Sequence, residues 1–249
     1  MIVLLPPSET KRLGGDGHPL QLDELGTPEL TPLRSQLVQE LVALAEDEPA
    51  CRAALGISAN QRAEIARNAA LLSSATIPAM HRYTGVLYDA LDYGSLAAAE
   101  MTRARNRLAV GSALFGLLRA DDLIPAYRLS AGSKLPGQPR LSARWRPVLE
   151  PALGALAARE LVVDLRSKAY TGLARLPGAI SVDVLAERAD GHRSVITHFN
   201  KAYKGKLARA LAATAKEPTD AQSVAAVARG AGIRVECNDT ELTLIVAAD

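Results

Sequence analysis

The chain has 249 residues, of which 48% are hydrophobic and 22% are charged, and its net charge is +2. This balance is typical of a folded globular protein and excludes a disordered or fibrous chain. Its apolar runs are far shorter than the ~20 residues of a membrane helix, so we expect no membrane partner. Two cysteines and four scattered histidines give no disulfide framework and no metal-site spacing. We therefore expect a cytoplasmic protein with no metal, no cofactor and no obligate protein partner.

The first half of the chain predicts two strands with helices between them. Residues 2–5 are an apolar run that stops at two prolines, which is typical of a buried strand ending in a loop. Residues 31–45 repeat leucine at helical spacing, and residues 53–72 contain two shorter helical pieces. Residues 107–114 have the composition of a second strand.

The second half predicts alternating helices and strands, which are listed here in chain order. We expect a helix at 147–159, a buried strand at 161–165, strands at 179–186 and 194–199 on either side of an Asp-Gly turn, helices at 201–213 and 220–228, and closing strands at 233–236 and 242–247. These elements predict an α/β (mixed α+β) fold. We expect residues 1–249 to form a single compact domain, with a mixed β-sheet core surrounded by helices.

Charge is unevenly distributed along the chain. Residues 101–146 carry nine basic side chains and two acidic ones, and residues 193–216 carry six basic side chains and no acidic one. If the fold brings the two segments together, they form one positive face that binds phosphate. The alternative is two separate solvated helix faces.

Polar side chains follow the strand-like runs. Because the ends of adjacent strands in an α/β sheet converge on a crevice, we expect these side chains to share a pocket for a small molecule or a flipped base. The candidate catalytic residues are Lys11, Asp121 and Tyr170, which offer an amine, a carboxylate and a phenol. The candidate phosphate or nucleic-acid contacts are Ser8, Thr10, Tyr83, Arg128, Lys134, Arg166, Lys168, Lys201 and Lys204.

Each of these assignments has a structural alternative. Asp121 can instead cap a turn, and Tyr83 can instead belong to a buried tyrosine pair with hydrogen-bonded hydroxyls. Lys201 and Lys204 can lie on a solvated helix face.

Four segments, spread in order over nearly the whole chain, resemble the YaaA family of peroxide-stress proteins. They are residues 6–11 (Pro-Pro-Ser-Glu-Thr-Lys), residues 83–88 (Tyr-Thr-Gly-Val-Leu-Tyr), the long stretch 112–135 and the basic helix 200–209. The resemblance implies a mixed-sheet α/β domain with a helix-hairpin-helix-like element in the N-terminal third. It also implies a positively charged cleft, DNA binding and a role in limiting oxidative DNA damage. The hairpin element maps to residues 48–68, where Gly56 is the one glycine of a hairpin that is usually glycine-rich.

Three functions remain open from the sequence. The first is a DNA-binding protein of the peroxide-stress response. The second is an enzyme acting on a nucleobase or nucleotide, such as a DNA N-glycosylase or lyase, and the third is a protein–protein adaptor. A catalyst needs a partly buried amine or carboxylate with a shifted pKa, whereas a binder needs only a basic groove. The deciding observation is whether Lys11, Arg128 and Lys134 face one cavity.

Overall fold

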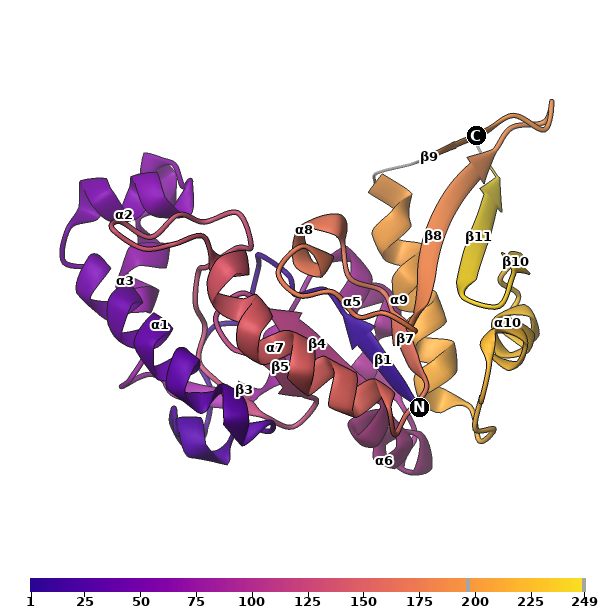
Figure 1. Cartoon of the computed structure of the whole chain (residues 1–249), viewed down its shortest axis with the longest axis horizontal. Coiled ribbons are helices and arrows are strands. Elements are labelled where there is room, and N and C mark those ends of the chain that lie inside the picture. Colours follow the sequence, from indigo (N-terminus) through magenta and orange to yellow (C-terminus); the bar gives the residue numbers. More distant parts are fainter. Residues whose placement is uncertain (196–197, 248–249) are drawn as a thin grey trace.

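A computed structural model describes residues 1–195 and 198–247 (Figure 1). In this part of the chain, eight strands form a mixed sheet whose main path runs β10-β11-β8-β7-β1-β4-β5. Its centre is parallel and consists of β11 (Glu241–Ala247), β8 (Ile180–Glu187), β7 (Val162–Asp164), β1 (Ile2–Leu5) and β4 (Leu108–Ser112). All four residues of β1 are buried, as expected for a parallel strand that is covered on both faces. The predicted mixed α/β domain is confirmed.

Antiparallel strands complete the sheet. β5 (Gly116–Arg119) pairs with β4, and β10 (Val235–Cys237) pairs with β11. β9 (Arg193–Val195) pairs with β8, so the predicted hairpin around Asp190-Gly191 is present. The predicted strand 194–199 is only partly comparable, because residues 196–197 lie outside the described residues and a helix begins at His198.

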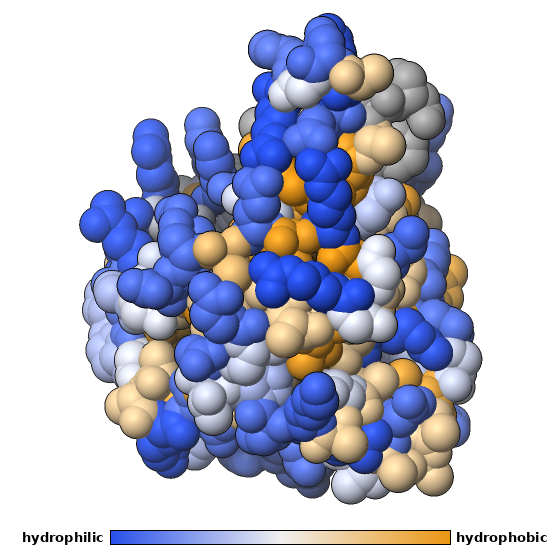
Figure 2. Space-filling model, turned by 90° about the vertical axis from the view of Figure 1, so that its right-hand side faces the viewer, coloured by the Kyte–Doolittle hydropathy of each residue, from blue (hydrophilic) through white to orange (hydrophobic). Residues whose placement is uncertain are grey.

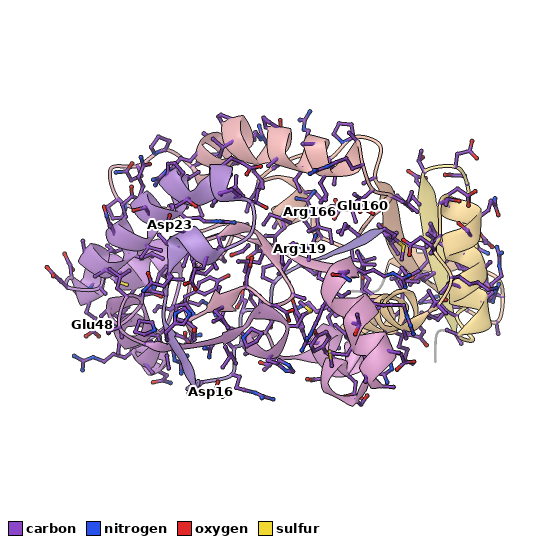
Figure 3. All side chains as sticks on the ribbon, turned by 90° about the horizontal axis from the view of Figure 1, so that it is seen from below. Asp16, Asp23, Glu48, Arg119, Glu160 and Arg166 are labelled. Atoms are coloured by element: carbon purple, nitrogen blue, oxygen red, sulfur yellow. The ribbon has the colours of Figure 1, made fainter. Side chains whose placement is uncertain are left out.

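Helices cover both faces of the sheet. α7 (Leu141–Ala157) lies on one face, while α5 (Val86–Leu91), α6 (Ala98–Arg107) and α9 (His198–Ala213) lie on the other (Figures 1 and 3). α10 (Ala221–Gly230) packs against α9 and the outer strands β10 and β11. No helix in the described residues is long and apolar enough to cross a bilayer.

The end of the sheet that contains β8, β10 and β11 is open to solvent on one face. Along β8, Ile180, Val182 and Val184 are buried, whereas Ser181 and Asp183 are exposed. Figure 2 shows this end of the molecule, where hydrophilic side chains surround a narrower group of apolar ones. The charges there include ion pairs of Arg193 with Glu187 and Glu236, and of Arg234 with Glu187. Paired charges of this kind limit association through an exposed sheet edge.

A helical lobe lies at the opposite end of the sheet from β10 and β11. It contains α1 (Thr31–Leu44), α2 (Glu48–Leu55) and α3 (Ala63–Ala69), and it adjoins a small antiparallel sheet. The small sheet consists of β2 (Gly17–Pro19), β3 (Ala75–Pro78) and β6 (Leu123–Ile124). The two remaining α-helices, α4 (Ala79–Arg82) and α8 (Lys168–Thr171), are single turns. The predicted helix over 31–45 is confirmed by α1.

The predicted hairpin element corresponds to α2, a turn and α3. The side chain of Asp47 accepts a hydrogen bond from the Ala50 N–H at 3.0 Å and so caps the start of α2. The helix ends at Gly56, whose φ of 64° is the left-handed conformation that favours glycine. The segment is therefore two helices joined by a connection that contains a short 3-10 helix at Ala59–Gln61, and its use as a DNA-binding helix-hairpin-helix stays a prediction.

Candidate functional site

The loop that follows β1 folds back over the side chain of Lys11. The Lys11 main chain forms an isolated antiparallel bridge with Tyr83, which holds the loop against the start of α5. The Lys11 Nζ donates a hydrogen bond to the main-chain oxygen of Ser8 at 2.9 Å and lies 3.4 Å from that of Glu9. It also lies 4.2 Å from the ring centroid of Tyr127 and 5.4 Å from that of Tyr83. The amine is thus enclosed by aromatic rings and carbonyl oxygens.

This enclosure changes the acidity of the amine. Burial, together with the positive charge of Arg128, lowers the pKa of Lys11 to about 7, although Glu64 and Glu9 act in the opposite direction. Most surface lysines are fully charged at neutral pH, whereas a large fraction of Lys11 is neutral there. A neutral amine is the nucleophilic form of lysine.

A chain of hydroxyl groups lies beneath the amine. The Tyr83 and Tyr127 hydroxyls are 2.8 Å apart, and the Tyr127 hydroxyl is 2.8 Å from Ser112 Oγ. Ser112 Oγ in turn accepts the Leu114 and Phe115 N–H groups. Tyr83 is 2% exposed and stacks on Tyr88, so its ring is not available to a base in this arrangement. The structural alternative for Tyr83, a buried tyrosine pair, is the one that the structure shows.

A cavity of about 420 Å³ opens beside this loop. Two basic side chains, Arg128 and Lys134, and one acidic side chain, Glu9, line it. Arg128 donates a hydrogen bond from Nη2 to Glu9 Oε2 at 2.8 Å, and Lys134 is exposed. The residues lining the cavity are Glu9, Ala53, Ala54, Leu55, Gly56, Arg128, Ser130, Gly132, Ser133 and Lys134. Arg128 and Lys134 therefore share one cavity, as expected, whereas Lys11 is not among its lining residues and touches it only through the main-chain oxygen of Glu9.

The cavity is built where the segment 128–134 meets the helical lobe. Asn68 of α3 is fully buried and grips the main chain of Arg128 with two hydrogen bonds of 2.8 Å, one accepted by Oδ1 and one donated by Nδ2. Six residues later, the Lys134 N–H donates to the Ala54 oxygen of α2 at 3.0 Å. The main chains of both residues are thereby fixed relative to the turn at Gly56.

Tyr170 belongs to the same region. It lies on α8, the turn of helix that follows β7, and burial raises the pKa of its hydroxyl to about 12. The charges of Glu9 and Arg128 act on that pKa in opposite directions. β1 and β7 are adjacent parallel strands, so the loops after them meet at one edge of the sheet.

The structure places Asp121 elsewhere. It is exposed, lies 3.6 Å from Arg105, and lines a separate cavity of about 350 Å³ with Glu24 and Arg119. Its neighbour Asp122 is buried and accepts the N–H groups of Gly26 and Arg119, so the capping role that was the alternative for Asp121 belongs to Asp122 instead. The expectation that Asp121 shares a pocket with Lys11 is wrong, because β5 and β6 carry it toward the small sheet.

The carboxylate that lines the cavity is that of Glu9, which pairs with Arg128 and was not selected as a site residue from the sequence. The one available signal was its position two residues before Lys11, in the segment that carries part of the family resemblance.

Two predicted phosphate contacts are buried inside the molecule. Arg166 is held by Asp164 through bonds from Nε at 2.9 Å and Nη2 at 2.8 Å, and Figure 3 shows it between the helical layers. Lys204 donates to the oxygen of Leu165 at 3.2 Å, and burial lowers its pKa. In this arrangement both cations are engaged with the strand end, whereas Lys168 and Lys201 are exposed.

Ser8 and Thr10 belong to a surface cluster of hydroxyls. Thr10 Oγ1 lies 3.1 Å from Ser8 Oγ and 3.2 Å from Thr84 Oγ1. Gly85 fits closely against the cluster, since an added Cβ would lie 3.3 Å from Thr10 Oγ1. The cluster shares the Lys11 loop.

Several arginines of the basic segment 101–146 form hydrogen bonds or ion pairs with other parts of the molecule. Arg103 and Arg107 donate to main-chain oxygens at and beyond the end of α9, including those of Ala213 and Leu211. Arg144 forms a two-bond ion pair with Glu40. Guanidinium groups satisfy carbonyls at helix ends in this way. The excess charge of this segment therefore does not all appear on one face.

No group of three or more metal-binding side chains occurs in the described residues.

Comparison with known proteins identifies the family to which this fold and pocket belong. The family model described as peroxide stress protein YaaA matches residues 1–229. The chain therefore belongs to the YaaA family of peroxide stress proteins. It is 49% identical over 253 residues to a UPF0246 protein of Corynebacterium efficiens, covering 99% of this chain and 100% of that relative. It is 44% identical to a UPF0246 protein of Streptomyces coelicolor (95% and 92% covered) and 30% identical to one of Shewanella woodyi (84% and 85% covered).

Proposed function

We propose that this protein binds DNA in the peroxide-stress response and holds backbone phosphates at the cavity lined by Arg128 and Lys134. The observation that carries the proposal is that one cavity joins these two cations to the turn between α2 and α3. Arginine and lysine side chains supply most phosphate contacts in protein–DNA interfaces, and their charge supplies most of the non-specific affinity.

The turn leaves room for a ligand. An added Cβ at Gly56 would meet nothing within 4 Å, so the cavity wall at the turn is open. The family resemblance implies a helix-hairpin-helix-like element in this segment, and the cavity is where that segment meets the cations.

Exposed lysines extend the positive potential along the sheet edge. Lys168 lies at the start of α8, directly after β7, and Lys201 lies one turn before Lys204, whose amine contacts Leu165 at the end of β7. A DNA backbone that enters the cavity at Lys134 and passes the end of β7 would meet both lysines. This path supports a phosphate-dominated interface with little reading of base sequence.

The test is the affinity for a fluorescently labelled DNA duplex as a function of salt. We expect the logarithm of the association constant to fall linearly with the logarithm of salt concentration, and Lys134→Ala to reduce the slope by about 1. Lys216→Ala is the matched control, because this exposed lysine lies in the connection between α9 and α10, at the opposite edge of the sheet from the cavity. A salt-independent affinity would refute DNA binding through phosphates.

A second candidate function rests on Lys11. Its partly neutral amine can attack C1′ of a damaged nucleotide, forming an N–C1′ bond while the glycosidic bond breaks and its electron pair leaves on the base, which takes up a proton. Opening of the sugar ring then gives a protonated imine, which borohydride reduces to a stable cross-link. We expect a cross-link to DNA that contains a modified base, lost in Lys11→Gln and kept in Lys216→Gln. Intact DNA binding without a cross-link or a released base would leave the binding function alone.

A further inference from the structure

The guanidinium of Arg128 makes fewer hydrogen bonds than its donors allow. Its side chain is 12% exposed, and its single hydrogen bond within the part of the chain that the structure describes runs from Nη2 to Glu9. Nε is buried and has no partner in the described residues. A buried donor without a partner loses its bonds to water and gains none in return.

Other arginines of this molecule show the complete arrangement. Arg144 engages both oxygens of Glu40 through two nitrogens, and Arg193 does the same with Glu236. Such two-point contact is the preferred geometry between a guanidinium and a carboxylate or phosphate. The contact of Arg128 with Glu9 has only one of the two bonds.

The two partners of this ion pair differ in how firmly they are held. Both the N–H and the carbonyl oxygen of Arg128 are hydrogen-bonded to the buried side-chain amide of Asn68. The Glu9 side chain is 68% exposed, so little packing fixes its carboxylate. The main-chain oxygen of Glu9, and not its carboxylate, contacts Lys11. The carboxylate can therefore leave Arg128 without releasing Lys11.

From this contrast we propose that Arg128 forms a phosphate-binding site that the Glu9 carboxylate occupies until a ligand displaces it. The displacing ligand carries a phosphate with two free oxygens, which Nε and Nη2 of Arg128 bind together while Lys134 supplies a second charge from the same cavity. The source of that phosphate, a nucleic-acid backbone, rests on the proposed function. Glu9 thereby acts as a built-in competitor that lowers the affinity for every phosphate ligand.

The first test is Glu9→Gln, an isosteric change at an exposed position that removes the competing charge. We expect the affinity for a labelled DNA duplex to rise about fivefold, the upper range for one exposed ion pair. In an Arg128→Gln background the same change should have no effect, because there is no cation left to unmask. Glu46→Gln, at an exposed acid between α1 and α2, controls for net charge. An equal gain in the Arg128→Gln background, or no gain in the wild-type background of a protein that does bind DNA, would overturn the proposal.

A second measurement separates this site from DNA binding. Inorganic phosphate is titrated into the protein while the arginine Nε–H resonances are followed by NMR. We expect the Arg128 resonance to shift and to saturate at a lower phosphate concentration in Glu9→Gln. A phosphate response without any DNA binding would keep the site and refute the proposed function. If neither probe binds more tightly to Glu9→Gln, the site is refuted whatever the protein's affinity for DNA.

Discussion

The Lys11 Nζ lies 4.2 Å from the centre of the Tyr127 ring, and the hydroxyl of that same ring is bonded to Ser112 at the end of β4. The loop after β1 and the end of its neighbour β4 are thus joined through one tyrosine. The contact places an amine at the carboxyl edge of the parallel sheet, among aromatic rings and main-chain oxygens. It has consequences for stability that can be measured without knowing the ligand.

Stability should depend on pH through Lys11. Its pKa is lowered from 10.5 to about 7 in the folded chain, so between these values the unfolded chain binds one more proton than the native one. The free energy of unfolding therefore rises with pH in this window, by at most about 1.4 kcal/mol per pH unit, and below the window the contribution of Lys11 no longer changes with pH. Lys11→Met removes this contribution.

Urea unfolding of the wild type and Lys11→Met from pH 6 to pH 10 checks this expectation. The difference between the two proteins should shift in favour of the wild type as the pH rises above 7. Parallel stability curves would show that the folded amine titrates normally.

The hydroxyl chain should contribute to stability through Tyr127. Tyr127→Phe leaves the buried hydroxyl of Tyr83 without its partner and removes a partner of Ser112. We expect a loss of about 1–3 kcal/mol in the free energy of unfolding, the cost of an unsatisfied buried donor or acceptor. The matched control is Tyr203→Phe on α9, for which we expect a change below about 0.5 kcal/mol. Equal denaturation midpoints for Tyr127→Phe and the wild type would contradict the argument.

The affinity for DNA should depend on Asn68, because this residue of the helical lobe holds the main chain of Arg128. Asn68→Ala leaves the buried N–H and carbonyl of Arg128 without their side-chain partner, so Arg128 loses its fixed position. We expect weaker DNA binding with a shallower salt dependence, together with a stability loss of about 1–3 kcal/mol. Asn68→Asp keeps the oxygen that accepts the Arg128 N–H and should retain more binding. Asn106→Ala, at an exposed position in α6, is the control. An unchanged salt slope in Asn68→Ala would mean that Arg128 contacts no phosphate.

Close packing of α5 against α9 should depend on Gly205. A Cβ at this position would lie 2.2 Å from the Leu87 oxygen and 2.8 Å from Ala90 Cβ, so the helices would have to separate. We expect Gly205→Ala to destabilise the protein by about 1–3 kcal/mol, in the range for overpacking. Gly154→Ala in α7 meets nothing within 4 Å and should stabilise the protein by about 0.5–1 kcal/mol through helix propensity. Thermal unfolding of the two variants should thus move in opposite directions.

The sequence alone was sufficient for the elements with a strong local pattern. The run Ile2–Leu5 forms the central strand β1, and the leucine repeat forms α1, because burial of a regular apolar pattern depends mostly on the chain itself. It also placed polar loops after β1 and β7, and adjacent parallel strands bring those loops together. The pairing of Arg128 with Lys134 in one cavity follows from that logic and from their nearness in the chain.

Tertiary structure decided which of the charged residues are free to act. Asp121 and Asp122 are neighbours in sequence, yet one is exposed in a second cavity and the other caps a buried turn. Lys204 and Arg166 come from basic segments but serve as internal hydrogen-bond donors. The acidic residue in the cavity with Arg128 is Glu9, whereas the sequence had predicted Asp121. The physical reason is that the effect of a charge depends on its burial and on partners within a few ångströms. In this protein those partners are often a hundred residues away along the chain, as Glu9 is from Arg128.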